Sequence, residues 1–146
     1  IYDIKKRADN KSMLVLLDDA GKIASYADVP DIALDLIEVA DKPTTIIYPG
    51  AKRLAPNLIA EDGTIGIRIT REEFTRSLIF RYNKPIVSTS ANISGEPSPH
   101  FFGEISEEIK NAVDYIVDYR RNDHKPAAPS SIIKRGMGGE IQIIRK

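Results

Sequence analysis

Short apolar runs alternate with amphipathic stretches and polar loops along the chain of 146 residues. The apolar and β-branched runs predict strands over residues 12–17, 44–48, 64–70, 85–87, 114–117, 132–133 and 141–144. Helical spacing and capping signals predict helices over residues 19–26, 30–40, 70–82 and 104–112. Helices and strands are interspersed without a strict repeat, and no domain boundary is visible. The pattern predicts a single α/β domain over residues 1–146, with a twisted mixed β-sheet flanked by helices.

Three of these helices begin with a recognisable local signal. Asp18 and Asp19 offer an N-cap, and Pro30 stands at a favoured first helical position. Thr70 and Glu73 match a capping box, in which a hydroxyl and a carboxylate satisfy amides that the first turn leaves free. We therefore expect the three helices to begin at these residues.

The strand over residues 64–70 alternates strictly. Ile65, Ile67 and Ile69 fall on one face and Arg68 on the other, because successive side chains of a strand point to opposite faces. If the second face meets solvent, Arg68 is an ordinary surface charge. If that face forms a cleft, Arg68 is a fixed clamp for a carboxylate or a phosphate.

Composition excludes several classes of function. The chain has no cysteine and two histidines, which excludes disulfides and thiolate catalysis and disfavours a histidine-rich metal site. No apolar run approaches the roughly 18 residues that cross a bilayer, and no signal-peptide pattern is present. The absence of cysteine makes a cytoplasmic location the default expectation. Lys with Arg and Asp with Glu number 21 each. The zero net charge disfavours a dedicated nucleic-acid binder but leaves room for a local basic pocket.

The first residues resemble the last turn of a helix, with cations where the helix dipole favours them. Since a domain rarely begins at the end of a helix, we expect a segment before Ile1. Lys5, Lys6, Arg7 and Lys11 place four cations ahead of the first strand, where they suit a phosphate or a carboxylate. Taken alone, this cluster is better interpreted as a solvated helix end.

The segment Lys84–Gly95 is a stronger candidate for a ligand-binding loop. A strand leads into three hydroxyls and an amide, from Ser88 to Asn92, and such groups beyond a strand end can bind an anion. A hydrogen-bonded turn is the alternative. Ser130 and Arg145 repeat the combination of a hydroxyl and a cation at strand ends. Without paired carboxylates, a serine–histidine pair or a Walker loop, catalysis would depend on positioning and charge stabilisation.

Two short motifs resemble signatures of the YrdC-like family. The motifs are Lys5-Lys6-Arg7, followed by Lys11, and Ser90-Ala91-Asn92. Pro43-Thr44-Thr45 before an apolar strand, TIGIRIT, PSSII and the final IIRK also fall in the family's order. The resemblance implies an α/β domain with a concave basic cavity. It also implies an enzyme that condenses L-threonine, bicarbonate and ATP into threonylcarbamoyl-AMP and pyrophosphate. A downstream complex would transfer the threonylcarbamoyl group to tRNA, and tRNA or double-stranded RNA would be a further partner.

The same resemblance implies roles for individual residues. The two signatures would supply the catalytic residues Lys5, Arg7, Ser90 and Asn92. ATP would be contacted by Arg7, Lys11, Thr64, Ser90, Ser98 and Arg145, and threonine by Arg68, Ser88 and Ser130. Mg²⁺ would be held mainly through the phosphates of ATP, so no metal-binding residue is expected.

The chain departs from the family pattern at three places. The family's P-T-[DE]-T-x-Y-G-L strand would precede residue 1, W-P-G-P is replaced by Ala40-Asp41-Lys42-Pro43, and Leu16 stands where some members carry histidine. Two alternatives remain open. One is the carbamoyl-adenylate domain of hydrogenase-maturation carbamoyltransferases, which normally carry zinc-finger cysteines on the same chain. The other is a non-catalytic RNA-binding module, against which the zero net charge and the absence of aromatic residues from Ser88–Gly95 argue.

Overall fold

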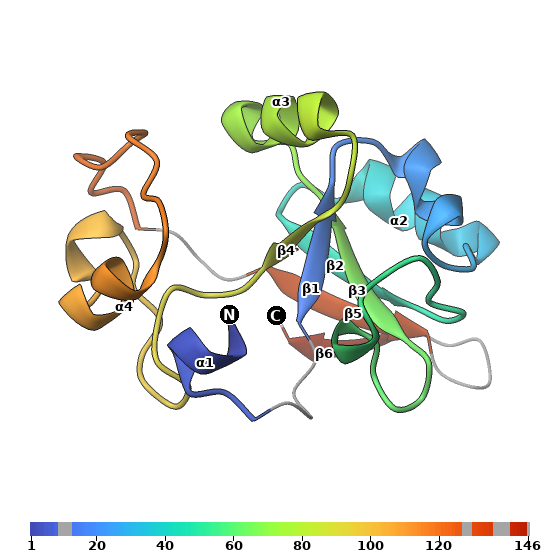
Figure 1. Ribbon diagram of the computed structural model, residues 1–146. Helices are drawn as coiled ribbons and strands as arrows, with labels where there is room; N and C mark the ends of the chain where they lie inside the picture. Colours follow the sequence, from blue (N-terminus) through green and yellow to red (C-terminus); the bar gives the residue numbers. More distant parts are fainter. Residues whose placement is uncertain (9–12, 127–129, 136–140, 146) are drawn as a thin grey trace. The chain divides into compact units, whose positions relative to one another are not determined.

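The computed structural model describes residues 1–8, 13–126, 130–135 and 141–145. The chain divides into two compact units. Figure 1 shows the ribbon with colours that follow the residue number. Of the described residues, 1–8 and 89–126 form the first, the helical unit, and 13–88, 130–135 and 141–145 form the second, the sheet unit. Each unit combines separate stretches of the chain.

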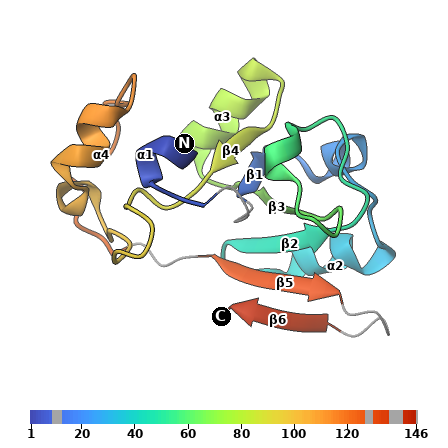
Figure 2. The ribbon, with the colours of Figure 1, turned by 60° about the horizontal axis from the view of Figure 1, so that its bottom comes forward.

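The sheet unit contains one six-stranded mixed sheet, in the order β4-β1-β3-β2-β5-β6. β1 and β3 are parallel, as are β2 and β5, and the other neighbours are antiparallel. Figure 2 shows β6 at one edge, beside β5. The strands are β1 (Leu14–Leu17), β2 (Thr44–Tyr48), β3 (Ile65–Ile69), β4 (Ile86–Ser88), β5 (Ser131–Arg135) and β6 (Ile141–Arg145). The predicted α/β class and these six strands are confirmed, and the turn expected over 136–139 lies outside the described residues.

One face of the sheet forms the hydrophobic core. Ile65 and Ile67 are each 1% exposed, so the alternation predicted for this strand is confirmed at these two residues, whereas Ile69 at its end is half-buried. The same core buries Val15 and Leu17 of β1, Ile46 and Tyr48 of β2, and Ile23, Ala33 and Ile79 from the helices of this unit. β4 is half-buried rather than buried as predicted, because it is an edge strand. The opposite face of the sheet combines apolar residues, among them Leu14 and Leu16, with polar and charged ones.

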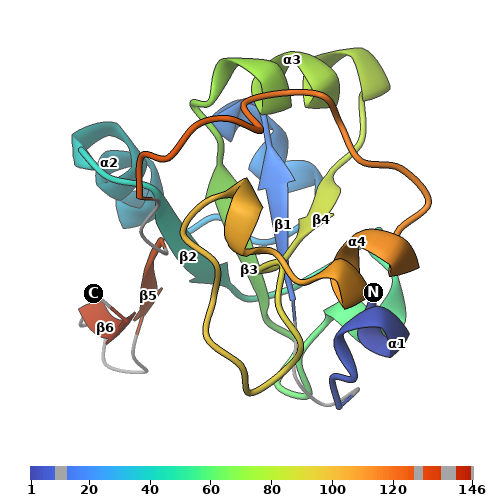
Figure 3. The same ribbon diagram turned by 90° about the vertical axis from the view of Figure 1, so that its left-hand side faces the viewer.

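Four helical segments belong to the sheet unit: the 3₁₀ helices η1 (Ala20–Ser25) and η2 (Pro56–Leu58), and the α-helices α2 (Asp31–Val39) and α3 (Glu73–Tyr82). Asp19 caps η1 as expected, whereas Pro30 is the N-cap of α2 and not its first residue. Figure 3 shows α3 at one end of β1. Within the described part of the chain, no helix is long and apolar enough to span a membrane.

The capping box predicted for α3 is wrong. The N-cap is Glu72, whose carboxylate accepts hydrogen bonds from the amides of Phe74 and Thr75 at 3.2 and 2.8 Å. Thr70 cannot serve as the cap because its own amide donates to the carbonyl of Leu17 at 2.9 Å and continues the pairing of β3 with β1. The N-cap therefore lies two residues later than predicted.

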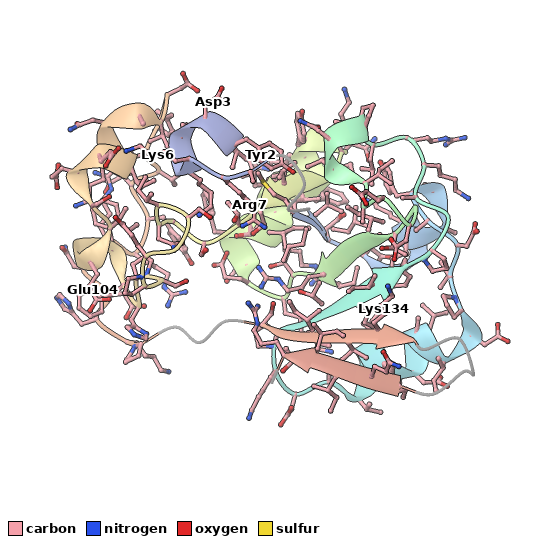
Figure 4. The ribbon with its side chains drawn as sticks, turned by 90° about the horizontal axis from the view of Figure 1, so that it is seen from below. Tyr2, Asp3, Lys6, Arg7, Glu104 and Lys134 are labelled. Atoms are coloured by element: carbon pink, nitrogen blue, oxygen red, sulfur yellow. The ribbon has the colours of Figure 1, made fainter. Side chains whose placement is uncertain are left out.

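The helical unit contains α1 (Tyr2–Lys5), the 3₁₀ helix η3 (Phe102–Glu104) and α4 (Glu107–Ala112). Lys6 beside α1 extends to Glu108 of α4, with 2.7 Å between the ammonium nitrogen and the carboxylate oxygen (Figure 4). The strand predicted over 114–117 is wrong. The guanidinium of Arg121 donates to the carbonyls of Ile116 and Val117 at 2.6 and 3.0 Å, so a side chain satisfies backbone groups that a neighbouring strand would otherwise pair.

Candidate functional site

Lys5 connects the two short motifs of the helical unit. It closes the short helix α1, and its side chain, 3% exposed, turns inward. The ammonium donates to the backbone carbonyls of Ser90 and Asn92, and lies 3.3 Å from the amide oxygen of Asn92. The Lys5 carbonyl in turn accepts from the amide of Ser94 at 2.8 Å. We call this arrangement the lysine clamp: it fixes residues 90–94 against the end of α1.

The interpretation of the N-terminal cations as a solvated helix end is wrong for Lys5. Burial lowers the pKa of its ammonium, and the charge of Arg7 lowers it further. A buried ammonium needs acceptors for its protons, and the Ser90–Asn92 segment supplies them. Lys6 does match the interpretation, since it is exposed and pairs with Glu108 on the surface of α4. Spacing alone could not separate these adjacent lysines.

Asn92 stabilises the same loop from within. Its side-chain amide donates to the carbonyl of Glu96 at 2.7 Å and to that of Ile93 at 3.2 Å. Both hydrogen bonds of the Asn92 amide group are therefore made within the turn. Ser90 is exposed. Ser98 lies exposed further along this loop, and Arg7 is half-buried and projects away from Lys6 (Figure 4). Lys11 lies outside the described residues.

In the sheet unit, the face opposite the core collects the predicted threonine-binding residues. Paired residues of neighbouring strands point to the same face. Leu14 pairs with Ser88, Leu16 with Arg68, and Arg68 with Thr45, so Ser88, Arg68 and Thr45 share one face. We call this surface the arginine face. It includes Ile132 and Arg145 through the next pairings of β2, β5 and β6, with a register shift beside Ile132.

Arg68 is the dominant charge of the arginine face. It is half-buried, and its side chain makes no hydrogen bond or ion pair within the described chain. Burial lowers the pKa of its guanidinium, and the positive charge of Arg145 lowers it further. Because a guanidinium stays protonated in proteins, the face carries a partly desolvated charge that an anion would stabilise.

Ser130 is held in place by contacts with Thr45 and Arg145. It is 3% exposed, and its hydroxyl oxygen lies 3.0 Å from that of Thr45, which is 2% exposed. The guanidinium of Arg145 donates to the Ser130 carbonyl from Nε and Nη2, at 3.0 and 2.7 Å, and Nη2 lies 3.4 Å from the hydroxyl. The sequence predicted no site role for Thr45, because only the pairing of β2 with β3 and β5 shows what it faces.

Thr64 lies just before β3 and is engaged by an acidic residue. Its hydroxyl donates to Asp62 at 2.6 Å, and Asp62 also pairs with Lys134 of β5 at 2.8 Å (Figure 4). Hydrogen bonds from Lys134 and Thr64 lower the pKa of Asp62 to about 2. Asp62 and Lys134, which sequence reasoning also missed, therefore fix the orientation of Thr64. Among the described residues, no group of three His, Asp or Glu is arranged to hold a metal ion.

The chain belongs to the Sua5/YciO/YrdC family, whose model, described as telomere recombination, matches residues 1–146. It is 39% identical over 135 residues to a Methanocaldococcus jannaschii protein provisionally named threonylcarbamoyl-AMP synthase, covering 92% of this chain and 62% of that protein. It is 28% identical over 142 residues to the threonylcarbamoyl-AMP synthase of Pseudoalteromonas translucida, covering 94% of this chain and 74% of the relative. The predicted family is confirmed.

Solved structures share the fold. P. abyssi Sua5 complexed with L-threonine aligns with a TM-score of 0.78 at 22% identity, over 91% of this chain and 39% of Sua5. T. kodakarensis HypF aligns with a TM-score of 0.79 at 24% identity, over 99% of this chain and 19% of HypF. The chain therefore spans less than half of either protein. At these identities the likeness establishes the single-domain α/β fold and leaves substrates to be argued from the residues.

The lysine clamp leads to a prediction that compares two adjacent lysines. Lys5→Met should lower the free energy of unfolding by about 1.5–3 kcal/mol, the usual contribution of hydrogen bonds to a charged group. It should also speed amide hydrogen exchange at residues 90–96. Lys6→Met, which removes an exposed ion pair, should change both quantities little. Equal effects of the two substitutions, measured by denaturant unfolding and exchange, would contradict the clamp.

Proposed function

We propose that this chain catalyses the ATP-dependent synthesis of threonylcarbamoyl-AMP from L-threonine and bicarbonate, with release of pyrophosphate. The observation that carries the proposal is Arg68, a half-buried cation without a partner in the described chain, on the same face as Ser88. A carboxylate such as that of threonine suits a guanidinium bidentately. The names of the curated relatives and the L-threonine in the Sua5 complex support this substrate.

The helical unit would bind the nucleotide. Arg7 supplies a positive charge, and the exposed Ser90 lies on the loop that the lysine clamp holds. Contacts from Ser98, Lys11, Thr64 and Arg145 are proposed on the family resemblance alone. ATP would enter as its Mg²⁺ complex, with the ion bound by phosphate oxygens and water, since the described residues offer no acidic cluster. The expectation of a concave basic cavity remains part of this proposal.

Lys5 has a different role here from the one that its motif implied. Its ammonium is already engaged by two carbonyls and lies 3.3 Å from an amide oxygen, so we propose that it positions the Ser90 loop and does not contact the reacting atoms. Asn92, engaged within the turn, would act in the same way. Positive charge near the phosphates would then come from Arg7. Positioned groups of this kind lower a barrier without reorganising during the reaction.

The reaction needs no side-chain nucleophile. The amine of threonine would attack bicarbonate to form a carbamate with loss of water. A carbamate oxygen would then attack the α-phosphorus of ATP, and the bond from that phosphorus to the bridging oxygen would break to release pyrophosphate. Charge accumulates on phosphate oxygens in such a transfer, and cations that neutralise it accelerate the step. Arg68 would hold the threonine carboxylate away from this chemistry, leaving the amine free to react.

Two alternatives make different demands on the residues. A carbamoyl-adenylate domain like that of hydrogenase maturation shares the fold, but a carbamoyl group without an amino acid gives the unpaired Arg68 no carboxylate to bind. A phosphate of RNA could itself pair with Arg68, but the zero net charge and the absence of aromatic residues from Ser88–Gly95 argue against the RNA-binding alternative. We therefore favour the synthase. A tRNA-modifying role implies a cytoplasmic location and a downstream complex that receives the threonylcarbamoyl group.

The first test is substrate dependence. The full-length protein should release pyrophosphate from ATP only when L-threonine and bicarbonate are both present, because the amine and the carbonate form the attacking group. A coupled pyrophosphate assay with each substrate omitted in turn measures this. Equal release with and without threonine would exclude the synthase. Release that needs a carbamoyl donor in place of threonine would favour the hydrogenase-maturation reaction.

The second test concerns Arg68. Arg68→Lys keeps the charge but loses the planar fork, so KM for threonine should rise by about tenfold or more while KM for ATP changes little. Arg76→Lys, an exposed arginine of α3, is the matched control and should behave as wild type. Steady-state kinetics on both variants give the comparison. A threonine KM that is unchanged in Arg68→Lys would refute the carboxylate contact.

A further inference from the structure

Thr45 is a buried polar residue to which the proposed function assigns no role. Its side chain is 2% exposed in the middle of β2, opposite Arg68 of β3. Its hydroxyl oxygen lies 3.0 Å from that of Ser130, across the pairing of β2 with β5. A valine would fill the same volume without burying a polar group, so a hydroxyl at this position calls for a partner. Ser130 is that partner.

The contact continues from Ser130 to Arg145. Arg145 donates two hydrogen bonds to the Ser130 carbonyl, and its Nη2 lies 3.4 Å from the Ser130 hydroxyl. The guanidinium of Arg145 is close enough to Arg68 for its charge to lower the pKa of that residue. Thr45, Ser130 and Arg145 thus form a chain of contacts that ends beside Arg68.

Gly66 leaves room for the methyl group of Thr45, since a Cβ atom at Gly66 would lie 3.3 Å from that methyl carbon. The β-branched side chain of Thr45 is restricted in its own χ1 rotation, which favours a fixed direction of the hydroxyl toward Ser130.

We propose that Thr45 is a positioning residue. Its contact with the Ser130 hydroxyl fixes Ser130, whose carbonyl accepts the hydrogen bonds of the Arg145 guanidinium. Thr45 thereby holds a second positive charge beside Arg68. The ligand of this pair of charges rests on the proposed function, in which an anionic substrate binds the arginine face. The contact between Thr45, Ser130 and Arg145 stands independently of the substrate. The two parts can therefore fail separately.

The test uses the full-length protein and three variants. Thr45→Val removes the hydroxyl and keeps the shape, and Thr45→Ser restores the hydroxyl. Thr44→Val is the matched control, because its hydroxyl donates to the Lys42 carbonyl from the neighbouring position of the same strand. Two kinds of measurement are made. ¹⁵N NMR gives the exchange rate of the Arg145 Nε proton, and steady-state kinetics give kcat and the KM values for threonine and ATP.

Thr45→Val should speed exchange of the Arg145 Nε proton and raise the threonine KM, each by about three- to tenfold, the effect of losing one hydrogen bond. The value of kcat should change less, Thr45→Ser should recover most of both effects, and Thr44→Val should show neither. If Thr45→Val does not fold, Thr45→Ala takes its place, since it removes the hydroxyl without adding bulk.

Each other outcome decides a different claim. Exchange and KM in Thr45→Val that match Thr44→Val overturn the positioning role. Faster exchange with an unchanged threonine KM overturns the link from Thr45 to the substrate. Faster exchange in Thr45→Val, together with a wild-type protein that shows no threonine dependence, overturns the proposed function and leaves the contact chain intact.

Discussion

The half-buried positive charge of Arg68 is the constraint on which the account of the site depends. Removing a charged guanidinium from water costs free energy, and the positive charge of Arg145 repels Arg68 and adds to that cost. Within the described chain no carboxylate pairs with Arg68. A protein can retain such a charge when a bound anion compensates it, and this is the reason for proposing that the arginine face binds the substrate. The neighbouring hydroxyls of Ser88, Ser130 and Thr45 then have a reason to lie there.

The helical unit also contains a buried positive charge, but there the protein itself supplies the hydrogen-bond acceptors. Lys5 is also buried, but its charge is satisfied by backbone carbonyls of the loop that it holds. The lysine therefore fixes the loop to which the exposed Ser90 belongs. The contrast between a satisfied Lys5 and an unsatisfied Arg68 is the basis for proposing that the first positions the loop and the second binds a ligand. Motif membership alone assigns both to the site without distinguishing them.

Much of the fold follows from local pattern, and its errors have identifiable causes. Alternation in TIGIRIT predicted the burial of Ile65 and Ile67, since period-two patterning reports which face of a strand meets the core, but it did not predict that Ile69 would be only half-buried. The capping box failed because Thr70 was already committed to pairing with β1. The 114–117 strand failed because Arg121, outside the segment, satisfied its carbonyls. Thr45 and Asp62 could not be found, since their importance comes from partners that only the sheet register supplies.

The central claim is that Arg68 binds the carboxylate of threonine. A crystal structure of the full-length protein with L-threonine tests it most directly. The account predicts two hydrogen bonds between the Arg68 guanidinium and the ligand carboxylate, each about 2.7–2.9 Å long, with the amino group left free of the arginine. Threonine bound elsewhere, or bound with its carboxylate away from Arg68, would contradict the account even though the family and fold assignments would remain.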